Sequence, residues 1–268
     1  MGRLALRLIV AVVFVFLLLP LFTVVVASFS TGAPLSFPPP GFTTDWYRNI
    51  SPEFMTALRT SLVVGVGATA VATVVGTLGG IALQRGNLLG RRLLTTLCLS
   101  PLMVPTLVIG VSLFQFTLVV WDVFGLSVGD TIIGIILGHS AFATPFVIRS
   151  VLAGQAHHDM SLEEAALNLG ASPTQAFFKV TVPLLMPGIV AGAIFAFLTS
   201  FDDVPVALFL GGTNTVTLPV KIFTSIEFSF DTSVMAVATI VVAGSTLLMI
   251  AVDRLIGLES FLGTSRAQ

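Results

Sequence analysis

The sequence predicts an all-α membrane protein with six transmembrane helices and both termini in the cytoplasm. Of its 268 residues, 55% are hydrophobic and only 9% are charged, and the mean hydropathy is +1.04. Soluble domains have about a quarter of their residues charged, so this composition excludes a soluble fold. The chain contains six charge-free stretches, each long enough to supply a membrane-crossing helix of roughly 20 apolar residues. They predict spans near 8–28, 60–83, 94–120, 131–150, 185–210 and 233–252.

The first of these spans has two interpretations, a retained anchor and a cleaved signal peptide. Arg3 and Arg7 precede it, and VVVAS at 24–28 resembles a cleavage site. Its apolar core of about 20 residues is longer than the roughly 7–15 that signal peptides use, which favours a retained anchor.

The distribution of basic residues predicts the orientation. With the N-terminus inside, the inner segments hold nine Lys or Arg residues and the outer segments hold three: Arg48, Arg59 and Lys221. Short cytoplasmic loops are enriched in Lys and Arg, so this bias places both termini in the cytoplasm.

The outer loop, residues 29–57, is rich in proline and predicts a short surface helix at TTDWYRN. Trp46 and Tyr47 in this loop suit the membrane interface, where amphipathic aromatic side chains accumulate, although contact with an outside partner is an alternative. Small residues recur every four positions at Ala68–Gly80 and at Gly188–Ala196, and this spacing predicts close helix packing.

The inner loop between the fourth and fifth spans is the most hydrophilic part of the chain. Ser161 and Glu164 have the spacing of a capping box that opens a helix, and Gly170 follows as a C-cap. Ser172 and Gln175 predict a second start, with Pro173 at the first helical position, and Pro183 is expected to end that helix. Two capped helices exceed what a simple connection between spans needs, so the loop is expected to dock a cytoplasmic partner.

A specific signature runs through this loop. It reads Glu164-Ala165-Ala166, three residues, Gly170, nine residues, and then Val180-x-Val182-Pro183. The pattern resembles the EAA loop of ABC importer permeases, EAA-x3-G-x9-I-x-L-P, with valine in place of the isoleucine and the leucine. GFTTDWY, HSAFATPFVI, LLMPGIVAGAIFAFLTSFDDV and LPVKIFTSIEFS further resemble the permeases of spermidine/putrescine importers, so the likeness covers about residues 41–252.

The resemblance implies a fold, partners and a role for the loop. It implies a type I importer permease, a single domain over 1–268 with its core at about 57–255, in a bacterial inner membrane that it crosses several times. Its implied partners are two ATP-binding subunits, a second homologous permease and an extracytoplasmic solute-binding protein. The coupling loop, residues 150–184, would seat on the ATPase through Glu163, Glu164, Ala165, Ala166, Gly170 and Pro183. The expected solute is a polyamine; other amines, amino-acid derivatives, opines and aminophosphonates are alternatives.

The chain is expected to bind no cofactor of its own. No G-x-x-x-x-G-K-[ST] phosphate-binding loop occurs, so ATP and magnesium would be used by the partner ATPase. His157 and His158 are adjacent without further ligands and make a poor metal site, and the net charge of −1 argues against nucleic acid.

Asp202 and Asp203 lie in the apolar run SFDDVPVALF of the fifth span. A carboxylate in mid-membrane costs about 2.5–3.5 kcal/mol, so two of them need compensation. Pro205 loosens the helix there, and broken helices near ionisable groups are a recurring form of solute site. The sequence therefore predicts that Asp202, Asp203 and His139 line the solute pathway. One alternative is that one aspartate caps the resumed helix while the other pairs with Lys221 or meets interfacial water; a proton relay or a metal contact is another. For His139 the alternative is a neutral imidazole that is hydrogen-bonded within the helix bundle.

Two other classes of protein are less consistent with the sequence. An intramembrane enzyme could draw on GHS at 138–140, but consecutive helical residues diverge and cannot pair as nucleophile and base. A channel working alone would leave the capped inner loop without a purpose. The sequence therefore favours a transport subunit without catalytic residues.

Overall fold

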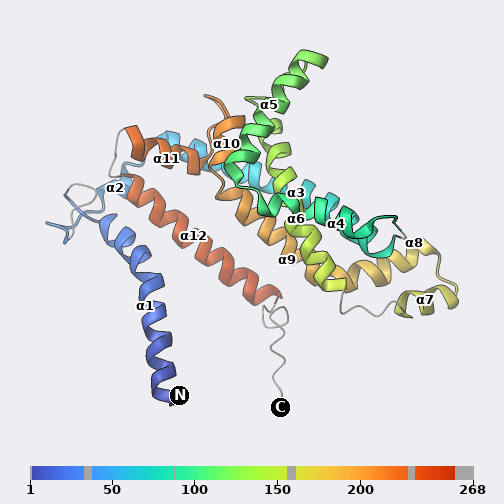
Figure 1. Ribbon diagram of the computed structural model, residues 1–268. Coiled ribbons are helices and arrows are strands. Elements are labelled where there is room, and N and C mark those ends of the chain that lie inside the picture. Colours follow the sequence, from blue (N-terminus) through green and yellow to red (C-terminus); the bar gives the residue numbers. More distant parts are fainter. Residues whose placement is uncertain (1, 33–37, 87, 156–160, 229–232, 257–268) are drawn as a thin grey trace. The chain divides into compact units, whose positions relative to one another are not determined.

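The computed structural model describes residues 2–32, 38–86, 88–155, 161–228 and 233–256 (Figure 1). Every regular element in these ranges is a helix, apart from one isolated antiparallel bridge between Ser30 and Phe42. The all-α prediction is confirmed.

Five helical segments are long and apolar enough to cross a membrane. They are α1 (Arg3–Ala27), α3 (Pro52–Arg85), α5 (Thr106–Phe124), α6 (Ile132–Gln155) and the continuous run Pro173–Phe201. The last helix, α12 (Ser233–Ile256), has a shorter apolar stretch, Ser233–Leu247. The count of six spans and the cytoplasmic termini stay predictions.

The third predicted span, 94–120, is not one helix, so this part of the prediction is wrong. The chain forms α4 (Arg91–Leu99), a 3₁₀ turn (η1, Ser100–Met103) and then α5. Val104 is extended, with φ −92° and ψ 131°, because the ring of Pro105 disfavours helical geometry in the preceding residue. The break therefore follows from the proline-containing sequence SPLMVP.

The fifth span also differs from its prediction at both ends. Pro183 does not end a helix, because α8 (Pro173–Ala176), the π-helical turn η2 (Phe177–Thr181) and α9 (Val182–Phe201) follow without interruption. Pro183 has no N–H to donate to a helical carbonyl. The π-helical turn η2 lies just before it and shifts the local hydrogen-bond pattern, so the helical run continues through the proline. At the other end, α9 stops at Phe201 and a short α10 (Pro205–Leu210) follows, so the predicted span to 210 is broken at 202–204.

The chain divides into two units, Met1–Thr56 with Lys221–Gln268, and Ala57–Val220. In the first unit, the outer loop forms α2 (Asp45–Arg48), as predicted. Two aromatic residues of α2 form hydrogen bonds with the residues that follow α1. Trp46 Nε1 donates to the Ser30 carbonyl at 2.8 Å, and the Tyr47 hydroxyl lies 2.6 Å from Ser28 Oγ. Lys221, which begins the second part of this unit in α11 (Leu218–Phe228), pairs with Glu53. The single permease domain over 1–268 stays a prediction.

In the second unit, α3, α6 and α9 pack closely through glycine. A Cβ added to Gly76 of α3 would lie 2.6 Å from Val147 Cβ, and one added to Gly192 of α9 would lie 2.8 Å from Val147 Cα. Gly188 approaches the Ser150 carbonyl in the same way, at 2.8 Å. The small residues therefore bring α3 and α9 against α6, as their spacing predicted, and Val147 lies between two of these contacts.

Candidate functional site

The C-terminal end of α7 and the second capping box have the local structure that their sequence signals predict, whereas Ser161 is the first residue of α7 and its capping box with Glu164 stays a prediction. Helix α7 covers Ser161–Asn168, and Gly170 has a φ of +90°, a conformation that side chains other than glycine rarely adopt. The Gly170 and Ala171 amides donate to the carbonyls of Leu167 and Ala166 at 3.0 and 3.1 Å, which closes the helix end. Ser172 and Gln175 then form the second capping box, with both reciprocal hydrogen bonds present.

The two adjacent glutamates of α7 face different surroundings. Glu163 turns toward the rest of the second unit, where its carboxylate lies 2.7 Å from Arg85 Nη2 at the end of α3. The Thr181 hydroxyl in η2 donates to the same carboxylate at 2.6 Å. Glu164 is exposed, because successive helical residues point about 100° apart. Only the outward-facing glutamate, the first residue of the EAA signature, is available to a partner.

The outer surface of the coupling loop is apolar as well as charged. Among the described residues of this loop, five large hydrophobic side chains are at least two-fifths exposed: Leu162, Leu167, Leu169, Phe178 and Leu184. Ala165 and Pro183 are exposed and Ala166 is half-buried. An exposed apolar group on a short helix pair is typical of a protein interaction surface. His157 and His158 lie outside the described residues.

The two aspartates of SFDDVPVALF separate at the break between α9 and α10. Asp203 is buried, and its Oδ2 accepts hydrogen bonds from the Val206 and Ala207 amides at 2.8 and 3.1 Å. These are free donors of the first turn of α10, so Asp203 caps that helix. Asp202 is the C-cap residue of α9 and is exposed. The capping alternative therefore describes Asp203, and a solute contact by either residue stays a prediction.

His139 lies fully buried beside Asp203. Its Nδ1 is 2.8 Å from Ser200 Oγ on α9, and its Nε2 is 3.7 Å from Asp203 Oδ2, too far for a hydrogen bond. Within the described residues Nε2 has no hydrogen-bond partner. His139, Ser200 and Asp203 thus form a buried polar cluster where α6, α9 and α10 meet, with one ring nitrogen still able to bind.

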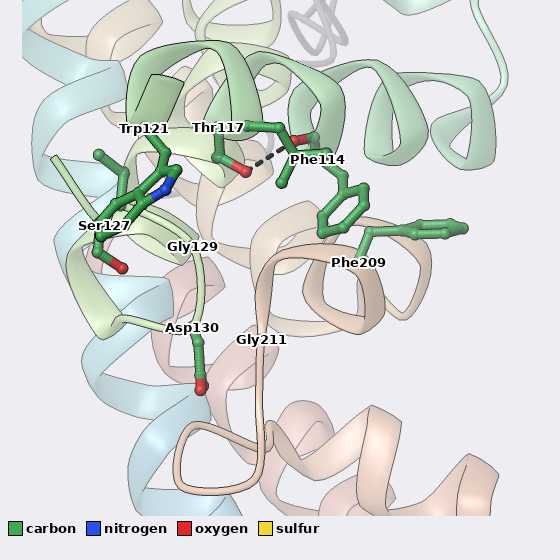
Figure 2. A pocket seen from close by; sticks show the side chains of 10 residues that line it. Phe114, Thr117, Trp121, Ser127, Gly129, Asp130, Phe209 and Gly211 are labelled. Atoms are coloured by element: carbon green, nitrogen blue, oxygen red, sulfur yellow. Dashed lines mark hydrogen bonds between the residues drawn. The ribbon is translucent and has the colours of Figure 1, made fainter. Parts of the chain in front are cut away.

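A shallow cavity of about 240 Å³ lies near the end of α5 (Figure 2). The side chains of Phe114, Trp121 and Phe209 line it, together with the segment that connects α5 to α6. Asp130 at its edge has a φ of +58° and accepts a hydrogen bond from Thr215 at 3.3 Å. None of the residues predicted for the solute pathway lines this cavity, so it is distinct from the buried polar cluster.

Sequence reasoning missed three residues of these sites: Arg85, Thr181 and Ser200. Arg85 lies 78 positions before Glu163, and no local spacing rule relates them. The only signal for Arg85 was its position as the first charged residue after the apolar stretch 60–84. That position contributed to the predicted membrane orientation and indicated no partner for the side chain.

Comparison with known proteins decides the family. A family model described as "Binding-protein-dependent transport system inner membrane component" matches residues 76–257, which include the coupling loop and the aspartates. The chain belongs to this family. It is therefore a permease component of an importer, and such components are not enzymes on their own, because the ATPase is a separate subunit.

Three bacterial permeases show the range of relatives. The putrescine transport system permease protein PotI of Escherichia coli is 30% identical over 231 residues, covering 85% of this chain and 82% of PotI. The trehalose transport system permease protein SugB of Mycobacterium tuberculosis is 35% identical over 210 residues, covering 76% and 74%. The spermidine/putrescine permease PotC of Escherichia coli is 30% identical over 241 residues, covering 89% of both chains.

Solved structures support the fold. A chain of a bacterial ABC transporter that imports the acidic polysaccharide alginate matches with a TM-score of 0.74 at 18% identity, covering 95% of this permease and 98% of that chain. A chain of the MetNI methionine ABC transporter matches with a TM-score of 0.60 at 21% identity, covering 80% and 98%. The permease component thus has the fold of ABC importer permeases.

Proposed function

We propose that this permease imports a polyamine or a related cationic amine by alternating access, driven by ATP hydrolysis on separate subunits. The observation that carries the proposal is similarity to PotI and PotC over 85–89% of the chain, combined with the buried Asp203 beside His139. A partly dehydrated ammonium group needs a carboxylate partner, and Asp203 is the buried carboxylate among the described residues of the second unit.

In this proposal the solute would bind the same carboxylate that caps α10. Asp203 holds the first turn of α10 through two amides, and His139 approaches the same carboxylate oxygen. An ammonium group arriving at Asp203 would add a charge-assisted hydrogen bond to this oxygen or its neighbour. Exposed Asp202, one residue earlier, would attract the cation before it reaches the buried cluster.

One observation favours a second candidate, a neutral solute. The trehalose permease SugB is 35% identical, which is a higher identity than that of either polyamine permease over a shorter length. Sequence identity therefore does not separate the two classes of solute. The buried carboxylate of Asp203 in the second unit is the feature that favours the amine.

The remaining assignments follow the family pattern. We propose that the coupling loop docks on an ATPase through Glu164 and its exposed apolar neighbours, and that two ATP-binding subunits use ATP and magnesium. A second, homologous permease would complete the membrane portion, and an extracytoplasmic binding protein would deliver the solute. The proposed location is a bacterial inner membrane.

Uptake by the reconstituted importer tests the proposed solute. The complex, with its binding protein, is placed in proteoliposomes and supplied with putrescine, spermidine or trehalose. The proposal expects ATP-dependent uptake of the two amines and none of the sugar. Uptake of trehalose alone would replace the amine with the neutral candidate.

A pair of variants tests the site. Asp203→Asn keeps an oxygen for the α10 amides but removes the buried charge, and Asp202→Asn removes the exposed charge. Both are expected to raise the KM for putrescine while the ATPase subunits stay bound. Unchanged uptake by both variants would return the aspartates to a capping role only.

A further inference from the structure

We propose that Arg85 and Thr181 are positioning residues that, with Glu163, form a brace between the coupling helix and two transmembrane helices. The brace would pass the movement of α7 directly into α3 as well as into α9. This inference rests on the proposed docking of an ATPase at the coupling loop.

The three side chains form a closed set of contacts. Arg85 makes two contacts with the Glu163 carboxylate, Nη1 to Oε1 at 3.0 Å and Nη2 to Oε2 at 2.7 Å. The Thr181 hydroxyl donates to Glu163 Oε2 at 2.6 Å and accepts from Arg85 Nη2 at 3.2 Å. Each residue thus binds both others, and the bidentate geometry fixes the orientation of the carboxylate as well as its distance.

The brace is largely shielded from water. The Arg85 and Glu163 side chains are 21% and 18% exposed, and Thr181 is completely buried. Exposed ion pairs contribute little because water and salt screen them, whereas this pair is shielded and has a third partner. It is therefore suited to resist a force applied to α7.

The chain itself connects α7 to the fifth span only through the short turn that contains Gly170. Gly170, with its left-handed backbone, and Ala171 separate α7 from the capping box of Ser172, so a push on α7 could be absorbed by rotation at this joint. The brace bypasses the joint, because Thr181 lies in the π-helical turn that leads directly into α9. It also adds a connection to the end of α3, which has no covalent link to the coupling loop.

A movement of α3 would reach the centre of the second unit. Gly76 and Gly80 of α3 lie against Val147 and Val151 of α6, so close that an added Cβ would come within 3 Å of the facing side chain. Such contacts leave no space to absorb a displacement. The brace therefore lets one coupling helix shift α3 and α9 together against α6.

The adjacent residues Glu163 and Glu164 have different roles in this proposal. Glu163 faces inward and holds the coupling helix, while Glu164 is exposed and faces the proposed ATPase surface. The two positions should therefore give different phenotypes when each is neutralised, although they are neighbours with the same side chain.

The test measures transport and ATP hydrolysis in the same proteoliposomes. Glu163→Gln and Arg85→Gln are expected to keep the ATPase subunits and their hydrolysis rate, while the amount of solute imported per ATP falls about tenfold, the size of a typical coupling free energy. Thr181→Val removes only the hydroxyl and should fold normally, with a smaller loss of the same kind. Arg92→Gln, at an exposed arginine of α4, is the matched control and should change neither quantity.

Further variants separate a mechanical role from a structural one. The charge reversal Arg85→Glu with Glu163→Arg should recover part of the uptake per ATP that either single reversal loses. Equal loss of uptake and hydrolysis, or full uptake per ATP in Glu163→Gln and Thr181→Val, would overturn the brace. Glu164→Gln should instead release the ATPase subunits; if it keeps them while Glu163→Gln still uncouples transport, the docking role of Glu164 fails and the brace stands.

Discussion

His139 Nδ1 lies 2.8 Å from the Ser200 hydroxyl, and this contact joins α6 to α9 inside the second unit. His139 is fully buried and Ser200 nearly so. Ring nitrogens in such a place need a partner, because an unpaired buried polar group loses its hydration without compensation. The contact therefore constrains which faces of α6 and α9 meet.

We expect Ser200→Ala to destabilise the permease by about 1–3 kcal/mol, the usual cost of leaving a buried polar group unpaired. The apparent Tm of the purified permease complex in detergent measures the effect. Ser112→Ala is the matched control, since Ser112 is exposed and bonds only within its own helix, to the Val108 carbonyl. An equal Tm for both variants would mean that the contact to His139 contributes nothing to stability.

The cap of α10 gives a second prediction. Asp203→Ala removes both hydrogen bonds to the Val206 and Ala207 amides, whereas Asp203→Asn keeps an acceptor oxygen. We therefore expect the alanine variant to lower the apparent Tm, at a cost of about 1–2 kcal/mol typical of a lost cap, and the asparagine variant to lower it less. The same thermal unfolding measurement compares them.

Asp202→Ala provides the control for this pair, because Asp202 is exposed and its side chain makes none of these capping bonds. It should leave the Tm within the error of the unsubstituted protein. A larger loss for Asp202→Ala than for Asp203→Ala would contradict the assignment of the cap.

The architecture and the coupling loop could be predicted because their signals are local. Gly170 and the Ser172–Gln175 box act within a few residues, and all three behave as their sequence positions indicate. Apolar length alone indicated the five long apolar helices, although the third predicted span also took in the separate helix α4. Helix breaks near proline were harder to predict, because Pro105 interrupts the helix inside a continuous apolar stretch, whereas Pro183 lies within a continuous helical run that contains a π-helical turn.

The contacts that define the sites could not be predicted from the sequence. Arg85 meets Glu163 across 78 positions, and His139 meets Ser200 across 61. Such pairs depend on which helix faces meet, and the close glycine contacts of α3, α6 and α9 set those faces. A pattern of single residues shows that a charge needs a partner, but only packing selects the partner.

The close contact between Gly192 and Val147 gives a third prediction. A Cβ at residue 192 would lie 2.8 Å from Val147 Cα, and a backbone atom cannot move aside as the end of a side chain can. We expect Gly192→Ala to cost about 1–3 kcal/mol through overpacking, seen as a lower apparent Tm. Gly244→Ala in α12 is the control, since nothing lies within 4 Å of its added Cβ and the helix should gain about 1 kcal/mol.

The left-handed backbone of Gly170 gives the last prediction. Its φ of +90° lies where a Cβ is strained, although space around the residue is open, so a substitution acts through backbone conformation alone. We expect Gly170→Ala to strain the end of α7 by about 1–2 kcal/mol, because left-handed geometry costs L-residues about that much. If ATPase binding needs this end in place, its Kd should rise about 5–30-fold. Gly170→Asn should lose less, since asparagine enters the left-handed region more readily; equal binding by the alanine and asparagine variants at the original affinity would show that α7 docks without this turn.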